Sequence, residues 1–415
     1  MEDYRTQAPP HARFPEKLNA FVRNQIWGWF WNYVKFRFGP RHRFQTYSGS
    51  GDNGIYPLAC SPHDKSADES ADAPIRLSVA GDWASGTAEA ELIAELMERS
   101  EPHFTIHLGD VYYVGDEDEM RTNCLGRRVK WPIGSMGSFA LNGNHEMYAN
   151  GHAYFDTLLP ALGMRQVGGA LAGQKASYFC LRNRFWDVIA IDTGYNSVGL
   201  PLLEMLPWFI PSCKLRREQL HWLRDVVKPR ESRRGIVLLS HHQNVSAFED
   251  VFTRPAQQLA EFIERPVLWL WGHEHRFAVY GKARTAGGIE SYGRCVGHGG
   301  MPVDIRFPVL RPEFPLVVYD DRLHATLRGL EVGFNGFSTL TFRGNTLVIE
   351  HRDIKNQLLL EEHWETDAGM LRGTKIERGV TASNIKTPAA LGVAIGNDPV
   401  VPRPGSIRGT HRDTK

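Results

Sequence analysis

Five short apolar runs of this chain each end at a block of residues that can bind metal ions. The blocks are Gly81-Asp82, Gly109-Asp110, Gly143-Asn144-His145-Glu146, Ser240-His241-His242 and Gly272-His273-Glu274-His275. Helical patterns lie between the runs, at residues 87–99, 216–227 and 256–264. This alternation predicts an α/β fold with parallel strands, whose carboxyl ends meet at one edge of a sheet. We therefore expect the polar blocks to come together at that edge, where open α/β sheets place their active sites.

Composition favours a globular protein without a general attraction for nucleic acid. The chain has 415 residues, of which 42% are hydrophobic, and its formal net charge is +1. It therefore lacks the global basic field that recruits nucleic acid, and no nucleic-acid partner is expected. The odd number of cysteines contains no C-x-x-C pair, which argues against a disulfide framework and a thiolate zinc site and favours a reducing cytoplasm. The five are Cys60, Cys124, Cys180, Cys213 and Cys295.

The first 70 residues form a predicted N-terminal extension with an aromatic-rich helix over residues 16–38. Apolar residues lie on all faces of this helix instead of on one, so we expect another surface to bury the helix. One interpretation is a peripheral membrane helix helped by its basic residues, and the other is a helix packed against the body or a partner subunit. The start of the chain has no signal-peptide pattern, and no apolar stretch reaches the roughly 20 residues that span a bilayer. We expect a cytoplasmic protein, with membrane association left open.

The remaining sequence predicts one domain and a tail. Residues 48–74 are rich in Ser, Gly, Asp and Pro and are typical of a surface linker. Residues 71–365 carry all of the polar blocks and form the predicted domain. From residue 366 to residue 415 apolar periodicity fades, which predicts a mobile C-terminal tail.

The polar blocks supply oxygen and nitrogen donors of Asp, Asn, His and Tyr, without a thiolate. Such donors suit Fe, Mn, Zn or Mg. Two metals about 3.5–4 Å apart need a bridging carboxylate, several imidazoles and open positions for water and phosphate. Asp110 is the best candidate for the bridge.

The order of these blocks resembles the calcineurin-like metallophosphoesterase family, whose pattern is D-x-H, G-D-x-x, G-N-H-[DE], an isolated His, and G-H-x-H. The resemblance spans about residues 75–362. It implies a four-layer α/β/β/α sandwich, here with an N-terminal helical extension, and a two-metal site at the strand ends. The activity that it implies is hydrolysis of a phosphomonoester or phosphodiester by a hydroxide held between the metals.

The resemblance also assigns roles to single residues. Asp82 and His275 would hold the first metal, and Asp110 would bridge. Asn144, His241 and His273 would hold the second metal. His145 would assist at the phosphate as an acid or charge stabiliser, and we expect Glu146 to orient it.

One departure from the family pattern concerns the first metal. Ala84 stands where the family has the His of D-x-H. The purple acid phosphatase branch also lacks that His and uses the Tyr of G-D-x-x-Y, which falls on Tyr113. A phenolate favours Fe(III), so Fe is expected at the Tyr113 site and Fe, Mn or Zn at the other. The alternative for Tyr113 is packing on a neighbouring helix, beside its equally aromatic neighbour Tyr112.

Several histidines have two interpretations. His241 directly follows its apolar run and is the expected ligand, with His242 as a supporting or substrate-contacting residue; the two roles could be exchanged. His298 lies in a glycine-rich loop and would either reach the phosphate or face solvent. His107 is expected to be a hydrogen-bonded core residue. Asp192 ends an apolar run, and it would be either a turn-forming residue or a catalytic one.

Two functions follow from these patterns. The first is a binuclear metal-dependent phosphoesterase whose substrate specificity resides between Glu146 and His241, including residues 194–196 and 201–211, and in the loop around His298. The second is a scaffold with the same fold and weak or no catalysis, which docks to a membrane or partner through residues 16–38.

Overall fold

The computed structural model describes residues 33–49, 51–61, 72–199, 211–305, 311–327, 330–378 and 385–386. Most of the predicted N-terminal helix lies outside these residues, as does nearly all of the stretch 201–211 that is expected to contribute to substrate specificity. Within the described part of the helix, residues 33–37 are helical. No helix among the described residues is both long and apolar enough to cross a membrane.

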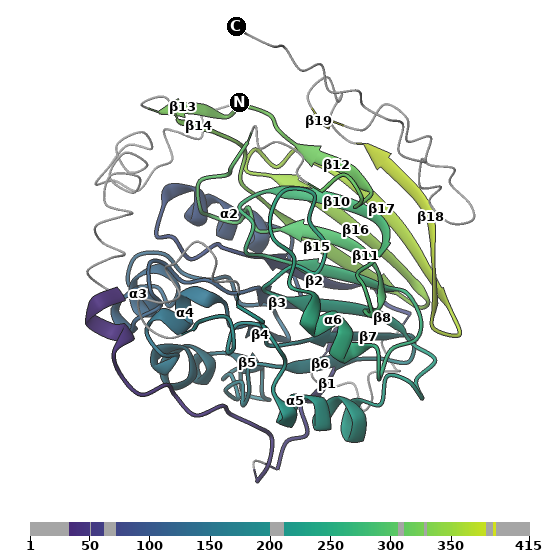
Figure 1. Cartoon of the computed structure of the whole chain (residues 1–415), viewed down its shortest axis with the longest axis horizontal. Helices are drawn as coiled ribbons and strands as arrows, with labels where there is room; N and C mark the ends of the chain where they lie inside the picture. Colours follow the sequence, from purple (N-terminus) through teal and green to yellow (C-terminus); the bar gives the residue numbers. More distant parts are fainter. Residues whose placement is uncertain are drawn as a thin grey trace, which may run out of the picture.

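Two large mixed sheets organise the described part of the chain (Figure 1). The order in the first sheet is β1 (Ile55–Pro57), β6 (Phe179–Arg182), β7 (Trp186–Ala190), β8 (Gly235–Ser240), β9 (Val267–Trp271), β11 (Glu290–Val296), β10 (Phe277–Arg284), β12 (Leu316–Asp320) and β19 (Ile385–Lys386). The order in the second sheet is β18 (Met370–Arg378), β17 (Leu358–Asp367), β16 (Thr346–Asp353), β15 (Gly336–Arg343), β2 (Ile75–Ala80), β3 (Phe104–His107), β4 (Gly137–Ala140) and β5 (Gly163–Met164). A separate hairpin pairs β13 (Ala325–Leu327) with β14 (Leu330–Val332).

Helices connect the parallel strands. They are α2 (Ala88–Arg99), α3 (Glu117–Asn123), α4 (Asn144–Tyr148), the π-helical turns η2 (Tyr154–Leu158) and η5 (Leu223–Val227), the 3-10 turn η3 (Leu159–Ala161), α5 (Arg217–Trp222) and α6 (Thr253–Leu259). Thr87, the first residue of the predicted helical pattern, caps α2, because its side chain accepts a hydrogen bond from the backbone N–H of Ala90.

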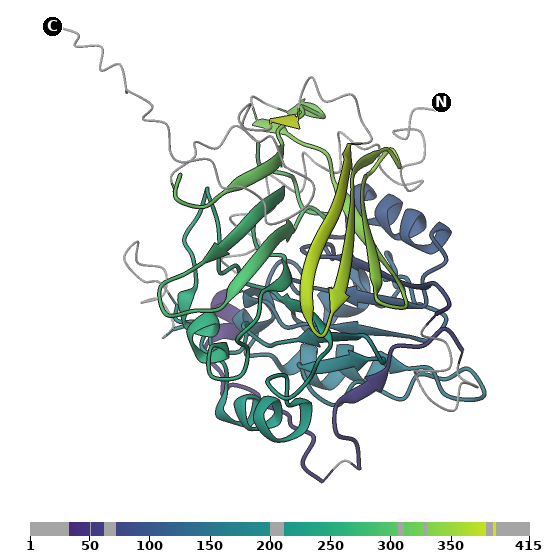
Figure 2. The same ribbon diagram turned by 90° about the vertical axis from the view of Figure 1, so that its right-hand side faces the viewer.

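Side chains alternate between two cores along each central strand, as the pleat of a sheet requires. In β8, Val237 and Leu239 pack between the two sheets, whereas Ile236 and Leu238 face the helices. In β2, Leu77 and Val79 pack between the sheets in the same way. The hydroxyl of Ser78, on the opposite face, meets the hydroxyl of Ser100 at the end of α2 at 3.0 Å. Two sheets thus pack face to face with helices outside them, in agreement with the predicted α/β sandwich (Figure 2).

The topology brings the polar blocks together. Strands β2, β3 and β4 are parallel in one sheet, and β7, β8, β9 and β11 are parallel in the other. The blocks follow β2, β3, β4, β8 and β9, so both sheets present their metal-binding residues at carboxyl ends of parallel strands.

The end of the second sheet corrects the predicted tail. Strand β18 pairs with β17 along its length, from Asp367 with Met370 to Leu360 with Arg378. The predicted boundary at residue 365 therefore lies inside β17, and the expectation of a mobile segment is wrong for residues 366–378. Residues 387–415 lie outside the described part of the chain.

Candidate metal centre

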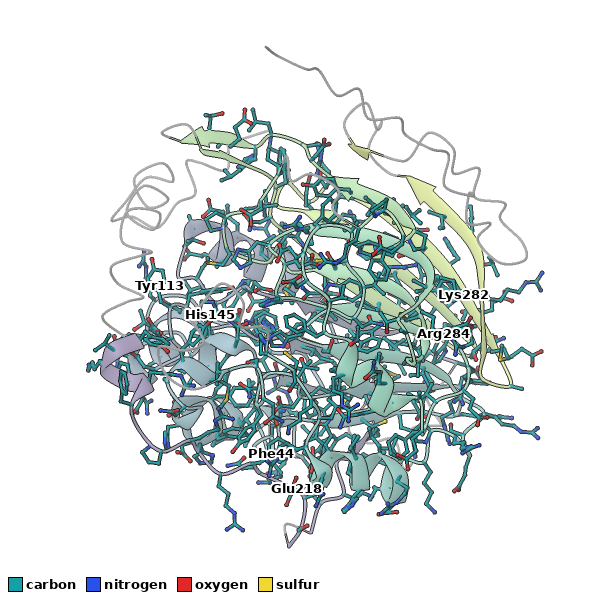
Figure 3. All side chains as sticks on the ribbon, in the orientation of Figure 1. Phe44, Tyr113, His145, Glu218, Lys282 and Arg284 are labelled. Carbon is teal, nitrogen blue, oxygen red and sulfur yellow. The ribbon has the colours of Figure 1, made fainter. Side chains whose placement is uncertain are left out.

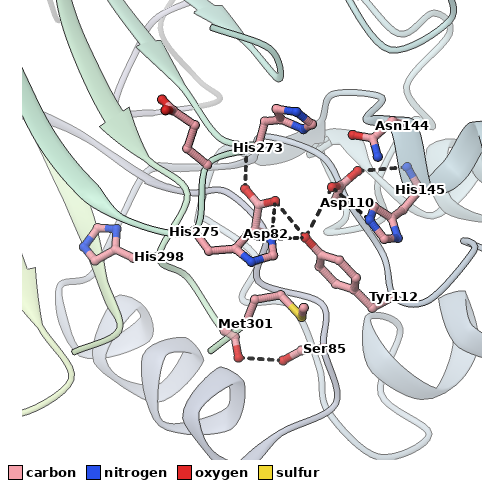
Figure 4. A network of polar contacts seen from close by, with 12 residues as sticks. Asp82, Ser85, Asp110, Tyr112, Asn144, His145, His273, His275, His298 and Met301 are labelled. Carbon is pink, nitrogen blue, oxygen red and sulfur yellow. Dashed lines mark hydrogen bonds and ion pairs between the residues drawn. The ribbon is translucent and has the colours of Figure 1, made fainter. Parts of the chain in front are cut away.

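The side chains predicted to bind metal converge at the strand ends. Asp82, Asp110 and His241 are fully buried, and one ligand atom from each lies within 4.8 Å of the others. His241, His242 and His273 form a second group with the same spacing. His241 belongs to both groups, so the two form one continuous cluster. Figure 4 shows Asp82, Asp110 and His273 of this cluster close together.

Glycines make room for this cluster. A Cβ atom on Gly109 would lie 2.8 Å from Nδ1 of His241, and one on Gly143 would lie 2.1 Å from Oδ1 of Asp110. A Cβ atom on Gly272 would lie 2.6 Å from Oδ2 of Asp82. Each distance is shorter than van der Waals contact, so a side chain at any of these positions would displace a candidate ligand.

Three candidate ligands have an unusual backbone conformation. The φ angles of Asp82, Asp110 and His273 are 55°, 72° and 66°. Non-glycine residues rarely adopt positive φ, and such outliers cluster at functional sites. The conformation directs each side chain from the strand end into the cluster.

The first group of contacts surrounds Asp82. The backbone N–H of His273 donates to Asp82 Oδ2 at 2.7 Å, and Nε2 of His275 lies 3.5 Å from Asp82 Oδ1. The hydroxyl of Tyr112 donates to Asp82 Oδ1 at 2.7 Å and lies 2.9 Å from Nε2 of His275. It also donates to Oδ2 of Asp110 at 3.2 Å. A tyrosine hydroxyl therefore joins the residues expected at the first metal to the expected bridge.

This tyrosine corrects the sequence assignment. The structure places Tyr112 in the cluster, whereas Tyr113 contributes its backbone carbonyl oxygen, 2.5 Å from Nδ1 of His145. Burial and the nearby Glu119 carboxylate raise the pKa of the Tyr113 phenol above its usual value. The prediction that the Tyr113 side chain enters the cluster is therefore wrong. The loop has no period-2 or helical pattern from which the sequence could have indicated Tyr112 instead.

The second group surrounds Asp110. Nε2 of His241 lies 3.3 Å from Asp110 Oδ1 and 3.2 Å from Oδ1 of Asn144. Nδ1 of His241 lies 2.9 Å from the carbonyl oxygen of Leu108. A proton on Nδ1 donated to this carbonyl leaves Nε2 to face the carboxylate and the amide, which is the usual support of a metal-binding histidine. Asn144 is held in turn by Tyr148, whose hydroxyl accepts from Nδ2 at 3.2 Å.

Electrostatics tie Asp110 to this histidine. Burial disfavours the charged form of the His241 imidazole, but the Asp110 carboxylate outweighs it and raises the pKa of His241 to about 9. Burial likewise acts to raise the pKa of Asp110, yet His241 and His145 hold it well below its usual value. Metal binding requires the neutral imidazole, so a metal at this position would release the His241 proton.

His242 points its ring toward Thr193. The Thr193 hydroxyl accepts from the backbone N–H of His242 at 3.0 Å and lies 3.1 Å from Nδ1 of the ring. The rings of His242 and His273 are 4.6 Å apart between centroids. Since His241 contacts Asp110 and Asn144, the geometry favours His241 as the inner residue and His242 as its neighbour.

His145 and Glu146 are adjacent in the sequence but contact different groups of the site. The backbone N–H of His145 donates to Asp110 Oδ1 at 3.0 Å, and its Nε2 lies 3.8 Å from Asp110 Oδ2. Glu146 does not orient this ring, contrary to expectation. Its Oε2 accepts from the backbone N–H groups of Gly143 at 2.8 Å and Asp110 at 3.2 Å. Glu146 therefore fixes the backbone that carries Asp110, and burial with the Asp110 charge raises its pKa to about 8.

His298 is neither at the cluster nor in solvent. Its side chain is fully buried and packs on Phe277, with ring centroids 5.3 Å apart. Neither ring nitrogen has a hydrogen-bond partner among the described residues, and burial lowers its pKa to about 3. Figure 4 shows His298 separated from Asp110 and His145. Both predicted positions are wrong, because the loop turns the side chain into the space between the sheets.

Two other residues have structural positions. Nδ1 of His107 accepts from the backbone N–H of Gly109 at 3.2 Å, and the ring is buried, as predicted for a core histidine. Oδ1 of Asp192 accepts from the backbone N–H of Tyr195 at 2.7 Å, and Oδ2 from the Ser177 hydroxyl at 2.5 Å. Asp192 thus forms a turn, the structural alternative of its two interpretations.

The residues present fit metal ions. Two carboxylates, an amide oxygen, a phenol and imidazoles make a donor set for Fe, Mn or Zn. The contacts of Asp82 and Asp110 within the described residues include no Lys or Arg. The charge partners of these buried carboxylates are therefore imidazoles such as His241, which give up a proton when a metal binds.

Comparisons with known proteins agree with this chemistry. The model of the calcineurin-like phosphoesterase family matches residues 75–277. No curated protein sequence matches the chain.

Solved structures with a similar arrangement include three proteins of low sequence identity. A purple acid phosphatase from yellow lupin is 12% identical with a TM-score of 0.42, over 69% of this chain and 53% of that one. GAP50 of Plasmodium, an anchor in the inner membrane complex, is 13% identical with a TM-score of 0.43, over 71% and 89%. PhoD is 10% identical with a TM-score of 0.45, over 75% and 73%. The matched part of this chain thus spans about half of the lupin enzyme.

Proposed function

We propose that this chain, of which residues 75–277 match the model of the calcineurin-like phosphoesterase family, hydrolyses phosphate esters with two metal ions held at this centre. The observation that carries the proposal is the convergence of Asp82, Asp110 and His241, whose ligand atoms lie within 4.8 Å of one another at the ends of parallel strands from both sheets. Buried carboxylates and imidazoles without a structural thiolate are typical of catalytic metal sites.

In this proposal the contacts divide the residues between two metals. Asp82, His275 and Tyr112 would hold the first, and Asp110 would bridge. Asn144, His241 and His273 would hold the second, with His242 beside them. When bound, the metals would activate water and neutralise charge on the phosphate oxygens.

The chain's own contribution to the reaction centres on His145. The Tyr113 carbonyl oxygen, 2.5 Å from Nδ1, fixes a proton on that nitrogen and directs Nε2 toward the cluster. His145 Nε2 lies on the Asp110 side of the site, 3.8 Å from Oδ2. Because Nδ1 carries the proton that faces Tyr113, the ring must bind a second proton and become an imidazolium before Nε2 can donate to a phosphate oxygen or to the departing alkoxide. The Tyr112 ring packs against this imidazole at a tilt of 56°, with centroids 4.3 Å apart, and limits its rotation.

We further propose Fe(III) as the first metal, held by Tyr112, and Fe, Mn or Zn as the second. Tyr112 compensates for the imidazole that is missing at Ala84, since its hydroxyl contacts both Asp82 and His275. This would place the chain near the purple acid phosphatase branch.

Asp110→Asn tests the proposal. The substitution keeps the shape of the side chain but removes the bridging charge, so hydrolysis of an aryl phosphate should fall by about 10³-fold or more, a loss of about 4 kcal/mol in transition-state stabilisation. Elemental analysis should show two metals per chain in the wild type and fewer in the variant. The exposed Asp225→Asn is the matched control and should keep both metals and full rate.

An Asp110→Asn protein that stays folded by circular dichroism and turns over at the wild-type rate would refute the assignment. None or one metal per wild-type chain, with no hydrolysis across a panel of phosphate esters, would instead favour the scaffold function. The aromatic helix on which that scaffold depends lies largely outside the described residues. Its membrane or partner contact, the cytoplasmic location and the absence of a nucleic-acid partner stay predictions.

A further inference from the structure

A strap of the N-terminal extension, residues 33–49, lies across the body of the protein. Nη1 of Arg37 donates to Oδ1 of Asn150 at 3.0 Å, and Nδ2 of Asn150 donates back to the carbonyl oxygen of Phe36 at 2.9 Å. Further along, Nη1 of Arg41 donates to the carbonyl oxygen of Tyr195 at 3.0 Å. Phe44 then stacks on Tyr178, with ring centroids 5.7 Å apart. Figure 3 shows Phe44 at the same end of the molecule as Glu218. The strap is thus fixed to segments far away in sequence.

At its centre the strap meets two potential ligands. Nε2 of His42 lies 3.2 Å from Oδ1 of Asp156, and Nδ1 of His152 lies 3.9 Å from Oδ2 of the same carboxylate. One ligand atom from each of the three residues lies within 4.8 Å of the others. His152 and Asp156 are four residues apart and face the same side of the helical segment that contains η2.

The state of the His152 ring suits metal binding. Its Nε2 lies 2.8 Å from the carbonyl oxygen of Pro40. A carbonyl only accepts hydrogen bonds, so Nε2 carries the proton and Nδ1 has a lone pair directed at Asp156. This is the arrangement in which metal-binding histidines are held, with one ring nitrogen on a backbone carbonyl and the other on the metal.

The spacing is close to that of a bound ion. Ligand atoms at 2.0–2.1 Å around a tetrahedral zinc are about 3.3 Å apart. Nε2 of His42 already has this separation from Asp156 Oδ1, and Nδ1 of His152 lies 3.9 Å from the other carboxylate oxygen. The ligand atoms of the three residues lie within 4.8 Å of one another, so the two imidazoles must approach each other by at most about 1.5 Å. Its side chain is 51% exposed, so it can move. Two imidazoles and one carboxylate select zinc or a similar transition metal over Mg²⁺ or Ca²⁺.

We propose that His42, His152 and Asp156 form a zinc site that fastens the N-terminal strap to the body. The site is separate from the proposed catalytic centre, with which it shares no residue. Water would fill the fourth position, because the carboxylate is 59% exposed.

Zinc at this position would also stabilise a loop beside the catalytic centre. The strap holds the carbonyl oxygens of Tyr195 and Gly199 through Arg41 and Arg37. Residue 194 of that loop packs so closely on the turn before Asn144 that a Cβ atom on Gly194 would lie 2.2 Å from the carbonyl oxygen of Asn142. Fastening the strap therefore restrains a loop in direct contact with the turn that presents Asn144 and His145.

Zinc titration of the full chain against a chromophoric competitor tests the site. Wild type should bind one more Zn²⁺ than Asp156→Asn or His152→Ala, because the loss of an inner ligand should weaken binding by more than the roughly 10-fold that an outer partner costs. His221→Ala, which removes another surface histidine, is the control and should bind as wild type does. Equal zinc counts in the wild type and both site variants would refute the site.

Trypsin gives a second readout independent of activity. Zn²⁺ should slow cleavage after Arg41 and Arg43 in the wild type and His221→Ala, but not in Asp156→Asn. The same cleavage rates with and without Zn²⁺ in the wild type would refute the fastening role. If the catalytic centre binds no metal, the difference of one zinc between wild type and Asp156→Asn remains, so failure of the proposed function and failure of this site are distinguishable.

Discussion

Two buried clusters of charged residues lie at different places in the sandwich, and they balance their charge differently. In the first, the metal centre, Asp82 and Asp110 contact imidazoles, a phenol and backbone N–H groups. In the second, the Arg294 guanidinium donates to both oxygens of Glu362, at 2.8 and 2.5 Å, and Nε2 of His351 lies 3.0 Å from the same carboxylate. All three residues of this ion-pair cluster are buried.

The difference lies in the source of the cation. Nη1 of Arg294 also donates to the carbonyl oxygens of Tyr280 and Gly293, each at 2.7 Å. The ion-pair cluster is therefore complete within the chain, whereas the metal centre has two carboxylates and no guanidinium or ammonium among its described contacts. The Arg294 guanidinium is permanently charged, whereas the imidazoles of the metal centre can release their protons to a metal ion, so an external cation belongs at the metal centre.

The largest effect that sharpens this comparison is on rate. His145→Ala should lower kcat by about 10²–10⁴-fold, the usual contribution of a general acid, while both metals and the unfolding free energy stay near wild type. Steady-state kinetics with elemental analysis measures this. Loss of metal together with rate would show that His145 is a ligand.

Glu362→Gln should have the opposite effect, because it should lower the stability of the protein and leave the rate of hydrolysis unchanged. It leaves Arg294 buried without its carboxylate, so the free energy of unfolding should fall by about 3–5 kcal/mol, while the folded fraction keeps its metals and rate. The matched control is Glu361→Gln on the same strand, whose ion pair with His363 is partly exposed and should be worth at most about 1 kcal/mol. Urea unfolding with chelator present measures both variants.

The difference in free energy of unfolding between wild type and Glu362→Gln should depend on pH through the pKa of Glu362. Burial acts to raise it, but Arg294 and His351 lower it from 4.5 to about 2 in the folded protein. A depressed pKa contributes stability that is present above the unfolded value and lost as pH falls toward the folded value. The difference in free energy of unfolding between wild type and Glu362→Gln should therefore have its full size above pH 4.5 and decrease toward pH 2. A gap that widens on acidification would contradict the ion-pair account.

Of the two buried clusters, only the metal centre should gain stability when metal is added. At a free metal concentration of 100 times Kd, binding should stabilise the wild type by about 2.7 kcal/mol, read as a rise in Tm. Glu362→Gln should show the same increment from a lower starting Tm. Asp110→Asn should show much less, and an undiminished increment there would place the stabilising metal elsewhere.

The smallest effect separates two neighbouring tyrosines. Tyr112→Phe removes a hydroxyl that contacts Asp82, Asp110 and His275, a loss of about 1.5–3 kcal/mol in interaction with charged groups. If Fe(III) occupies the first site, the visible charge-transfer band should disappear in Tyr112→Phe and persist in Tyr113→Phe. The reverse result would restore the assignment of Tyr113 from the sequence.

Much of the fold could be predicted because local signals were strong. Strand β2 ends directly before the Gly81-Asp82 block, as predicted, and α2 with its cap Thr87 covers the predicted helical pattern 87–99. The apolar residues that predict a helix over 256–264 continue past its end, since Phe262 and Ile263 are buried in the following turn. The helix instead spans Thr253–Leu259, and Pro255 is tolerated in its first turn. Strand β10 has no clear sequence signal because Gly281 interrupts its apolar run at an irregular register.

The residue types of the site could be predicted from the sequence, but the directions in which some of the side chains point could not. The glycine-flanked Asp, Asn and His blocks indicate which backbone positions meet at the sheet edge. Which of Tyr112 and Tyr113 enters the cluster depends on the loop backbone, and where His298 points depends on the packing against Phe277. Strand β18 was missed because it lies at the sheet edge, where only alternate residues such as Leu371 need to be apolar.

The glycines at the centre have a consequence for interpreting related chains. Gly109, Gly143 and Gly272 each occupy a place where one added methyl group would collide with a ligand or its backbone. Alanine at these positions should remove the metal centre while much of the sandwich, built from other residues, can still form. Three glycines could thus serve as a simple sequence marker that separates working enzymes from folds that have lost their chemistry.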